Sequence, residues 1–364
     1  YKKTITMRIL FSFSIFIVFL PLKTFGQETS NDSIKLDYNK ILSYCVQTNV
    51  KPVLSLLDVD TTKLSEKDKD FKLRFENRFK YSEDRSSLDG QKNTSVDKLV
   101  NIFKSYWRAS LLNPEKEYDS LLTANLNLFF SYERTSNKDS LNLDSLIHKF
   151  ISSKGYYTNG LGKVGRLQDL LVWKTQKDTT YTFSIFSEKI SAKVILMEDF
   201  ITIGWGKYAT LDKSIGGWAT DDALYCVKES YDIESDDFQI HYLAHEGRHF
   251  ADFKIFPKLS GYDLEYRAKL TELSLAQETI YPLINQFIGS ANYDSENQHP
   301  LANFVLIKGL SKKIFNSEFE NDMTKWKSIE VETLNQVAYE LLKENTKALY
   351  IEGTDVEYFI KKKQ

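Results

Sequence analysis

Three of the five histidines fall within nine residues of the segment DFQIHYLAHEGRHFAD, residues 237–252. His245 and His249 are four residues apart, so on a helix their imidazoles lie one turn apart and can converge on one ion. Glu246 stands between them in the HExxH arrangement, in which two imidazoles bind zinc and the glutamate acts as a base. His241 lies about 12 Å from His249 along such a helix, too far for one ion to take all three. We interpret His241 as a packing residue or as a support for a ligand.

This arrangement predicts a hydrolytic chemistry. A zinc ion held by three protein ligands keeps one position open for water, whose pKa the ion lowers towards neutrality. Glu246 can accept the proton of that zinc-activated water as it attacks a carbonyl, and can pass the proton to the leaving group. The competing interpretation is a surface helix with chance histidines, but histidine is rare in this chain, with five among 364 residues.

The third ligand is expected on the next helix, because two protein ligands make a weak site. A second helical pattern begins near Asp263 and carries Glu265 and Glu272, which lie about 10 Å apart along the axis, so that only one can reach the ion. Glu265 is expected in the first turn, nearest the returning loop, and is the first candidate, while Glu272 stays open. His299 follows 50 residues after His249 in a polar turn and is not expected to compete.

Two other residues of the histidine segment have expected roles near the ion. Asp252 lies one turn beyond His249, where it can accept the outer N–H of an imidazole. A solvated acid at the helix end is the alternative. Gly247 lies on the small, apolar face of the helix, where glycine costs about 1 kcal/mol relative to alanine. We therefore expect a neighbouring backbone to pack closely against Gly247.

The segments around the histidines predict an α+β domain. Four runs rich in β-branched and aromatic residues come first, and helical periodicity returns from Phe238 onwards. Ser235 is expected to cap the histidine helix, with acidic residues in its first turn. A short mixed sheet followed by helices, without regular alternation, favours α+β over a doubly wound sheet. The four strands are expected at residues 180–186, 192–198, 200–205 and 223–229.

The chain before residue 146 has a different pattern. Residues 1–26 have a basic start, an apolar run of 14 residues and a small residue before a polar stretch, which predicts a secretory signal peptide. An uncleaved N-terminal anchor is the alternative. Residues 27–145 predict an all-α region, and residues 146–364 the catalytic domain. Export to the periplasm, the cell envelope or the medium allows Cys45 and Cys226 to pair, and two separate buried thiols are the alternative.

The balance of charged residues limits which classes of partner molecule are expected. The 48 basic and 50 acidic side chains give a formal net charge of -2, which gives no reason to expect a nucleic-acid partner, whose polyanionic backbone favours basic surfaces. The GxGxxG spacing at residues 160–165 lacks the preceding apolar strand of a dinucleotide loop. Zinc is the cofactor that the HExxH arrangement predicts.

Residues 180–276 resemble the zincin metallopeptidases, and more narrowly the gluzincins, in which HExxH on one helix is completed by a glutamate on the next. The resemblance implies His245, His249 and Glu265 as zinc ligands, Glu246 as general base, and a peptide or protein as the substrate. Glu265 is followed three residues later by an alanine, as is frequent in that group, but it lies closer to His249 than in the best-known members, so Glu272 stays open. An edge strand at residues 216–227 would pair with an extended peptide.

The resemblance implies an exported zinc metallopeptidase, and two other functions stay open. One is a binding protein of the cell envelope on a catalytically idle zincin scaffold, in which the N-terminal helices do the work. The other is a zinc hydrolase that acts on a non-peptide amide. The intact Glu246 favours an enzyme, because a structural zinc site has no use for a base beside its ligand.

Overall fold

The computed structural model describes residues 34–87, 94–133, 142–185, 188–211, 216–220, 222–295 and 298–360, and the expected signal peptide lies outside them. The chain divides into two compact units. The first comprises the described residues up to Gln176 together with Met197–Ile215, and the second comprises Lys177–Leu196 together with the chain from Gly216 onwards. This division differs from the boundary expected at residue 145. Among the described residues, no helix has the length and apolar character needed to cross a membrane.

The first unit, built from the earlier part of the chain, is mainly helical. Its described residues up to Tyr132 form helices and short 3-10 turns only, as the all-α pattern predicted. It also contains three short strands, a later helix, α7, and residues 171–176 and 197–203 of the two long strands described below. Its elements are α1 (Tyr38–Val46), α2 (Lys51–Leu56), α3 (Glu66–Phe79), α4 (Ser95–Leu112), α5 (Asp119–Tyr132), α6 (Leu143–Ser153), β1 (Tyr157–Thr158), β2 (Gly162–Val164), β3 (Leu167–Asp169) and α7 (Gly204–Thr210).

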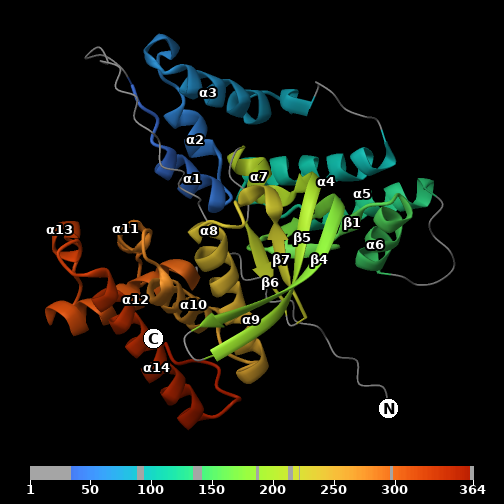
Figure 1. Cartoon of the computed structure of the whole chain (residues 1–364). Coiled ribbons are helices and arrows are strands. Elements are labelled where there is room, and N and C mark those ends of the chain that lie inside the picture. Colours follow the sequence, from blue (N-terminus) through green and yellow to red (C-terminus); the bar gives the residue numbers. More distant parts are fainter. Residues whose placement is uncertain are drawn as a thin grey trace, which may run out of the picture. The chain divides into compact units, whose positions relative to one another are not determined.

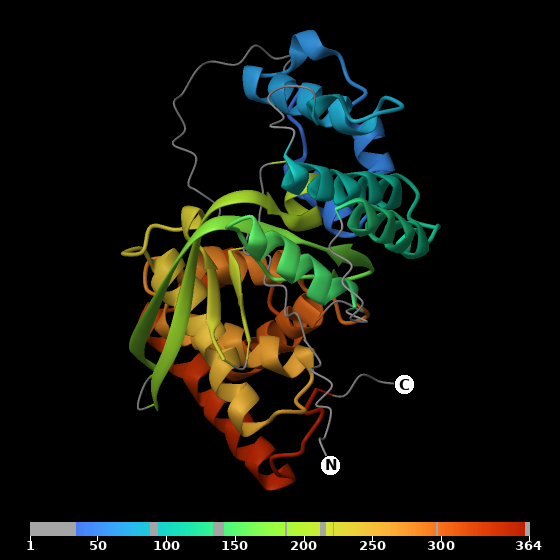
Figure 2. The same cartoon turned by 90° about the vertical axis from the view of Figure 1, so that its right-hand side faces the viewer.

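The main sheet has five strands in the order β1-β4-β5-β7-β6. The strands β4 (Leu171–Ile185) and β5 (Glu188–Ile203) are long and curved (Figure 2). The two strands expected at residues 192–198 and 200–205 are wrong as separate elements. Residues 192–203 lie in the single strand β5, which continues through Asp199 at φ 57°, and residues 204–205 begin α7. The shorter strands β6 (Gly217–Ala219) and β7 (Leu224–Val227) form an antiparallel hairpin.

The second unit contains the histidine segment and the helices that follow it, and the α+β class is confirmed. Its helices after α8 (Asp236–Phe238) are α9 (His245–Ile255), α10 (Gly261–Leu275), α11 (Ile280–Ser290), α12 (Gln298–Phe315), α13 (Met323–Trp326) and α14 (Val331–Glu352). Ser235 caps α8 as expected, since its hydroxyl accepts a hydrogen bond from the backbone N–H of Phe238. Cys226 in β7 and Cys45 in α1 are separate buried thiols rather than a disulfide.

Two of the apolar clusters in this unit fix the position of the histidine segment. In the first, Leu243, Phe250 and Ala251 of the histidine segment pack against Val194 and Leu224 of the strands. The second fills the space among α10, α11, α12 and α14, and includes Leu270 and Leu306. The histidine segment is thereby fixed to the sheet on one side and to α10 on the other.

Helix α10 packs against α9, α12 and α14 (Figure 1). Every residue from Asp263 to Ser274 is buried, although five of them carry charged side chains. A helix that is buried on all sides is ordinarily apolar, and buried charges need partners. The partners of the α10 charges define the site described below.

Candidate metal centre

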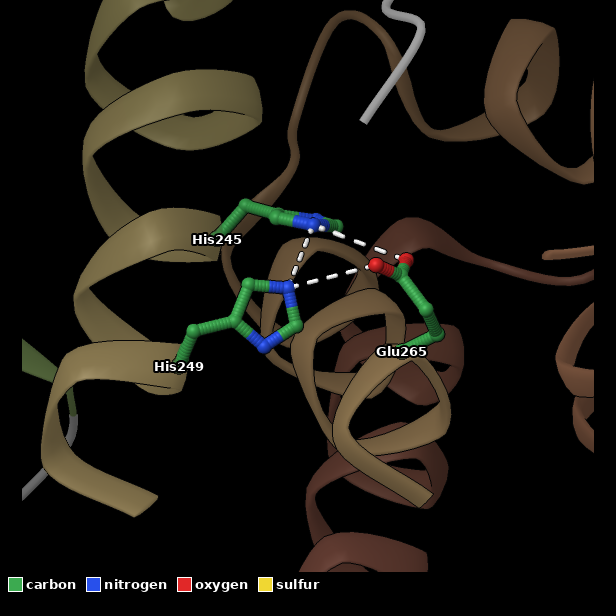
Figure 3. A group of neighbouring side chains, drawn as sticks. All are labelled: His245, His249 and Glu265. Atoms are coloured by element: carbon green, nitrogen blue, oxygen red, sulfur yellow. Dashed lines mark hydrogen bonds and ion pairs between the residues drawn. The ribbon is translucent and has the colours of Figure 1, made fainter. Parts of the chain in front are cut away.

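His245, His249 and Glu265 form a cluster whose possible ligand atoms all lie within 4.8 Å of one another (Figure 3). The Nε2 atoms of the two histidines are 3.1 Å apart. The carboxylate oxygens of Glu265 lie 3.4 Å from Nε2 of His249 and 3.7 Å from Nε2 of His245. All three side chains are fully buried. The structure therefore brings together the three residues predicted as ligands.

The helix pair explains this geometry. His245 and His249 lie one turn apart at the start of α9, so both imidazoles project from the same face. Ser260 caps α10 by accepting a hydrogen bond from the backbone N–H of Asp263. Because α10 begins at Gly261, Glu265 lies in its second turn, not in the first as expected.

Glu272 occupies a different place from Glu265. Its Oε1 atom lies 2.5 Å from Nδ1 of His245, on the side of the ring opposite the Nε2 atom that faces His249. Burial raises the pKa of Glu272, but the charges and hydrogen bonds of His245 and His241 outweigh it and lower the pKa to about 2. Glu272 is therefore an ionised partner of a ligand imidazole, while Glu265 contacts the Nε2 atoms.

The donor set fits zinc. Two imidazole nitrogens and one carboxylate oxygen are the ligands of a catalytic zinc site, and donors about 2.0–2.1 Å from a tetrahedral ion lie about 3.3 Å apart. The contacts of 3.1, 3.4 and 3.7 Å among the donors are close to that value. The contact of His245 with Glu272 also matches the usual support of a ligand histidine by an outer carboxylate.

The histidines and Glu265 of the cluster shift one another's pKa values, as groups that share protons or a cation do. Burial lowers the pKa of His249, but the hydrogen bond and charge of Glu265 outweigh it, so the pKa is raised above its usual value. Burial raises the pKa of Glu265, but His299 and His249 outweigh it and hold the pKa well below the usual range. The carboxylate is therefore ionised, and a proton on His249 competes with any metal.

Glu246 follows His245 directly in α9 and is buried. Its negative charge helps to raise the pKa of His249, and it also adds to the effect of burial in raising the pKa of Tyr242. Glu246 is thus an acid close to the ligand face but outside the cluster of three possible ligands.

Sequence reasoning missed His299. Its Nδ1 atom lies 2.9 Å from Oε2 of Glu265, and Lys269 approaches the same oxygen to 3.8 Å. His299 was assigned to a polar turn, but it is the second residue of α12. The signal that could have found it is Pro300, because proline is favoured in the first turn of a helix and so marks a helix start there.

The prediction for Asp252 was wrong in both its forms. Asp252 is fully buried rather than solvated, and its two oxygens accept hydrogen bonds from Nε and Nη2 of Arg267 at 2.7 and 2.9 Å. Arg248 also approaches it to 3.2 Å. Burial raises the pKa of Asp252, but the charges of the two arginines outweigh it and the pKa is lowered. Asp252 therefore links α9 to α10.

The close neighbour of Gly247 is a side chain, not the backbone that was expected. A Cβ atom at Gly247 would lie 2.2 Å from Cζ of Phe183 in β4. The aromatic ring therefore takes the space that any larger residue would need. Glycine at this position allows α9 to lie against the sheet.

Strand β6 lies at one end of the sheet, within the range where an edge strand was expected. The described part of the site can thus hold one divalent cation with two nitrogens and one oxygen, beside a buried acid. Comparisons of the chain with models of protein families, with curated proteins and with solved structures find no match.

Proposed function

We propose that this protein is an exported zinc-dependent metallopeptidase of gluzincin type, with a zincin-like catalytic domain. The observation that carries the proposal is the meeting of His245, His249 and Glu265 from two helices, with Glu246 buried beside them. A site that served structure alone would need no acid next to its first ligand. Export rests on the apolar N-terminal segment of the sequence.

Each residue has a separate role in hydrolysis. Zinc would supply a Lewis acid that polarises a carbonyl group and lowers the pKa of a water molecule. His245 and His249 bind it as neutral imidazoles, and Glu265 contributes a negative charge. Glu246 takes the proton of the attacking water and delivers it to the leaving amine.

The terminal strand β6 is our candidate for backbone pairing with the substrate, and all three of its residues are buried. An extended peptide can add to the free edge of a sheet through backbone hydrogen bonds, which require no particular side chain. β6 is a terminal strand, and the hairpin that contains it packs through Leu224 and Ala219 into the same apolar cluster as Phe250 of α9. The edge is thereby held in a fixed position relative to the helix that carries Glu246.

The test compares wild type with Glu246→Gln, both loaded with zinc, on quenched fluorescent peptide pools. We expect cleavage by the wild type and a loss of about 10²–10⁴-fold in the variant, with equal zinc content. Glu234→Gln is the matched control, because Glu234 is exposed and precedes the helix. A zinc-loaded wild type that cleaves no pool would favour the interaction protein, and cleavage of small amides alone would favour the non-peptide hydrolase.

A further inference from the structure

A π-helical turn, Gln239–Ala244, immediately precedes His245. Such turns are rare and occur frequently at functional sites. Here the turn carries His241, which is buried and whose Nδ1 atom lies 3.0 Å from Oε2 of Glu272. The other oxygen of the same carboxylate contacts Nδ1 of His245. One buried carboxylate is therefore shared by two imidazoles.

The shared carboxylate determines the hydrogen positions. We assign the donor role in both contacts to the imidazole Nδ1–H groups, because one carboxylate bridges the two rings and a carboxylate oxygen is an acceptor. In a neutral imidazole the other nitrogen then has a free lone pair. For His245 that nitrogen is Nε2, which faces His249 and Glu265. Glu272 thus selects the tautomer of His245 that can bind a metal.

His241 has a second partner besides Glu272. Its Nε2 atom lies 3.0 Å from the hydroxyl of Thr279, so both ring nitrogens have partners and the ring has a fixed orientation. A buried carboxylate oxygen that loses its hydrogen bond is unfavourable, and the group tends to reorient. Reorientation of Glu272 would release His245.

We propose that His241 is a positioning residue of the metal centre, which holds one oxygen of Glu272 so that the other keeps Nε2 of His245 directed at the cation. This inference rests on the zinc site of the proposed function. It requires that His241 acts through the contact of its Nδ1 atom with Glu272, and not only by filling space in the core.

Substitution of His241 by asparagine or by glutamine distinguishes the contact of Nδ1 with Glu272 from the contact of Nε2 with Thr279. The amide nitrogen of asparagine is two bonds from Cβ, as is Nδ1 of histidine, whereas that of glutamine is three bonds away, as is Nε2. His241→Asn therefore keeps a donor for Glu272, and His241→Gln keeps a polar partner for the hydroxyl of Thr279. His241→Leu removes both. Both amide variants are polar and of similar size, so their comparison remains usable if His241→Leu does not fold.

The readouts are the rate of zinc release to a chromophoric chelator, the absorption spectrum of the cobalt(II)-substituted protein, and thermal unfolding of the zinc-free protein. We expect His241→Asn to behave like wild type, and His241→Gln and His241→Leu to release zinc about tenfold faster, as is typical for loss of an outer group, with an altered cobalt spectrum.

Equal zinc release from His241→Asn and His241→Gln would overturn the inference, and lower zinc-free stability in both would identify His241 as a packing residue. Failure of the proposed function gives different results. A wild type that binds no zinc overturns the zinc site itself. A wild type that binds zinc but cleaves no peptide overturns the peptidase and leaves the effect of His241 on zinc release measurable.

Discussion

Helices α9 and α10 share two buried polar clusters of opposite character. The metal-facing cluster consists of His245, His249 and Glu265. The arginine cluster consists of Arg248, Asp252, Arg267 and Glu188, in which each arginine faces a carboxylate through two N–H groups. In the arginine cluster opposite charges are matched by paired hydrogen bonds, the arrangement that best compensates for burial.

The metal-facing cluster has no such paired contacts between an arginine and a carboxylate, although Glu272 contacts His245 and His299 contacts Glu265. Two imidazole Nε2 atoms face each other at 3.1 Å, and Nδ1 of His249 is buried without a hydrogen-bond partner among the described residues. Packing for stability alone would avoid such contacts, because buried polar groups are unfavourable unless they are paired. The difference indicates that the arginine cluster fixes the two helices, whereas the metal-facing cluster is arranged for a cation.

The largest effect on stability is expected in the arginine cluster. Asp252→Asn leaves two buried arginines with less negative charge, and breaking a buried pair in this way costs about 3–5 kcal/mol. Urea unfolding of the zinc-free protein measures this loss. Glu344→Gln, which breaks the more exposed pair with Lys313, is the control and should cost less than about 1 kcal/mol. Equal losses in the two variants would show that the arginine cluster contributes no more to stability than an exposed ion pair.

The metal-facing cluster should behave in the opposite way. Glu265→Gln removes the charged ligand, and we expect zinc affinity to fall by more than the roughly 10–100-fold that outer groups contribute. The zinc-free protein should lose less stability than it does in Asp252→Asn, because the amide keeps the size of the side chain and Glu265 faces histidines rather than two arginines. Competition with a chelator and zinc-free unfolding are the two measurements. Tight zinc binding by Glu265→Gln, together with loss of zinc binding in Glu272→Gln, would show that Glu272 rather than Glu265 is the third ligand.

A smaller effect is expected where α9 meets the sheet. Gly247→Ala forces a methyl group against Phe183, and overpacking of this kind costs about 1–3 kcal/mol. Gly206→Ala in α7 is the control, because a Cβ atom there meets nothing within 4 Å and alanine favours a helix. Thermal unfolding of both variants checks this, and Phe183→Leu should recover part of the loss in Gly247→Ala. No loss in Gly247→Ala would show that the ring moves aside freely.

The two clusters should also respond in different pH ranges. The raised pKa of His249 means that protons compete with zinc already above about pH 6.5, so affinity should fall by up to about tenfold per pH unit as the pH decreases through that raised pKa. The pKa of Asp252 is lowered, so its contribution to stability is complete above the unfolded value of about 3.9 and is lost only as the pH falls through the lower folded value. Zinc titrations and zinc-free unfolding across pH test the two ranges. Coincident ranges would contradict the comparison.

Local patterns in the sequence were sufficient for the histidine helix. The spacing of His245 and His249, the cap at Ser235 and the α+β order depend on residues close together in the chain, and the structure confirms the cap and the class. The choice of Glu265 over Glu272 depended on position along a single helix, and the structure places Glu265 nearest the two Nε2 atoms.

The remaining features depend on contacts between distant residues. Asp252 pairs with Arg267 because α9 and α10 pack in one register, which helical periodicity does not specify. His299 reaches Glu265 because α12 begins beside α10. The π-helical turn has no clear sequence signal, and Asp199 at positive φ allows β5 to continue where a break was expected.

Metal content tests the central claim most directly. Elemental analysis of the purified protein, prepared from residue 27 onwards alongside Glu265→Gln, measures zinc per chain. The arrangement of His245, His249 and Glu265 predicts about one zinc per wild-type chain and much less in the variant. No zinc in the wild type, even after zinc is offered and the excess removed, would contradict the assignment of these residues as a metal centre.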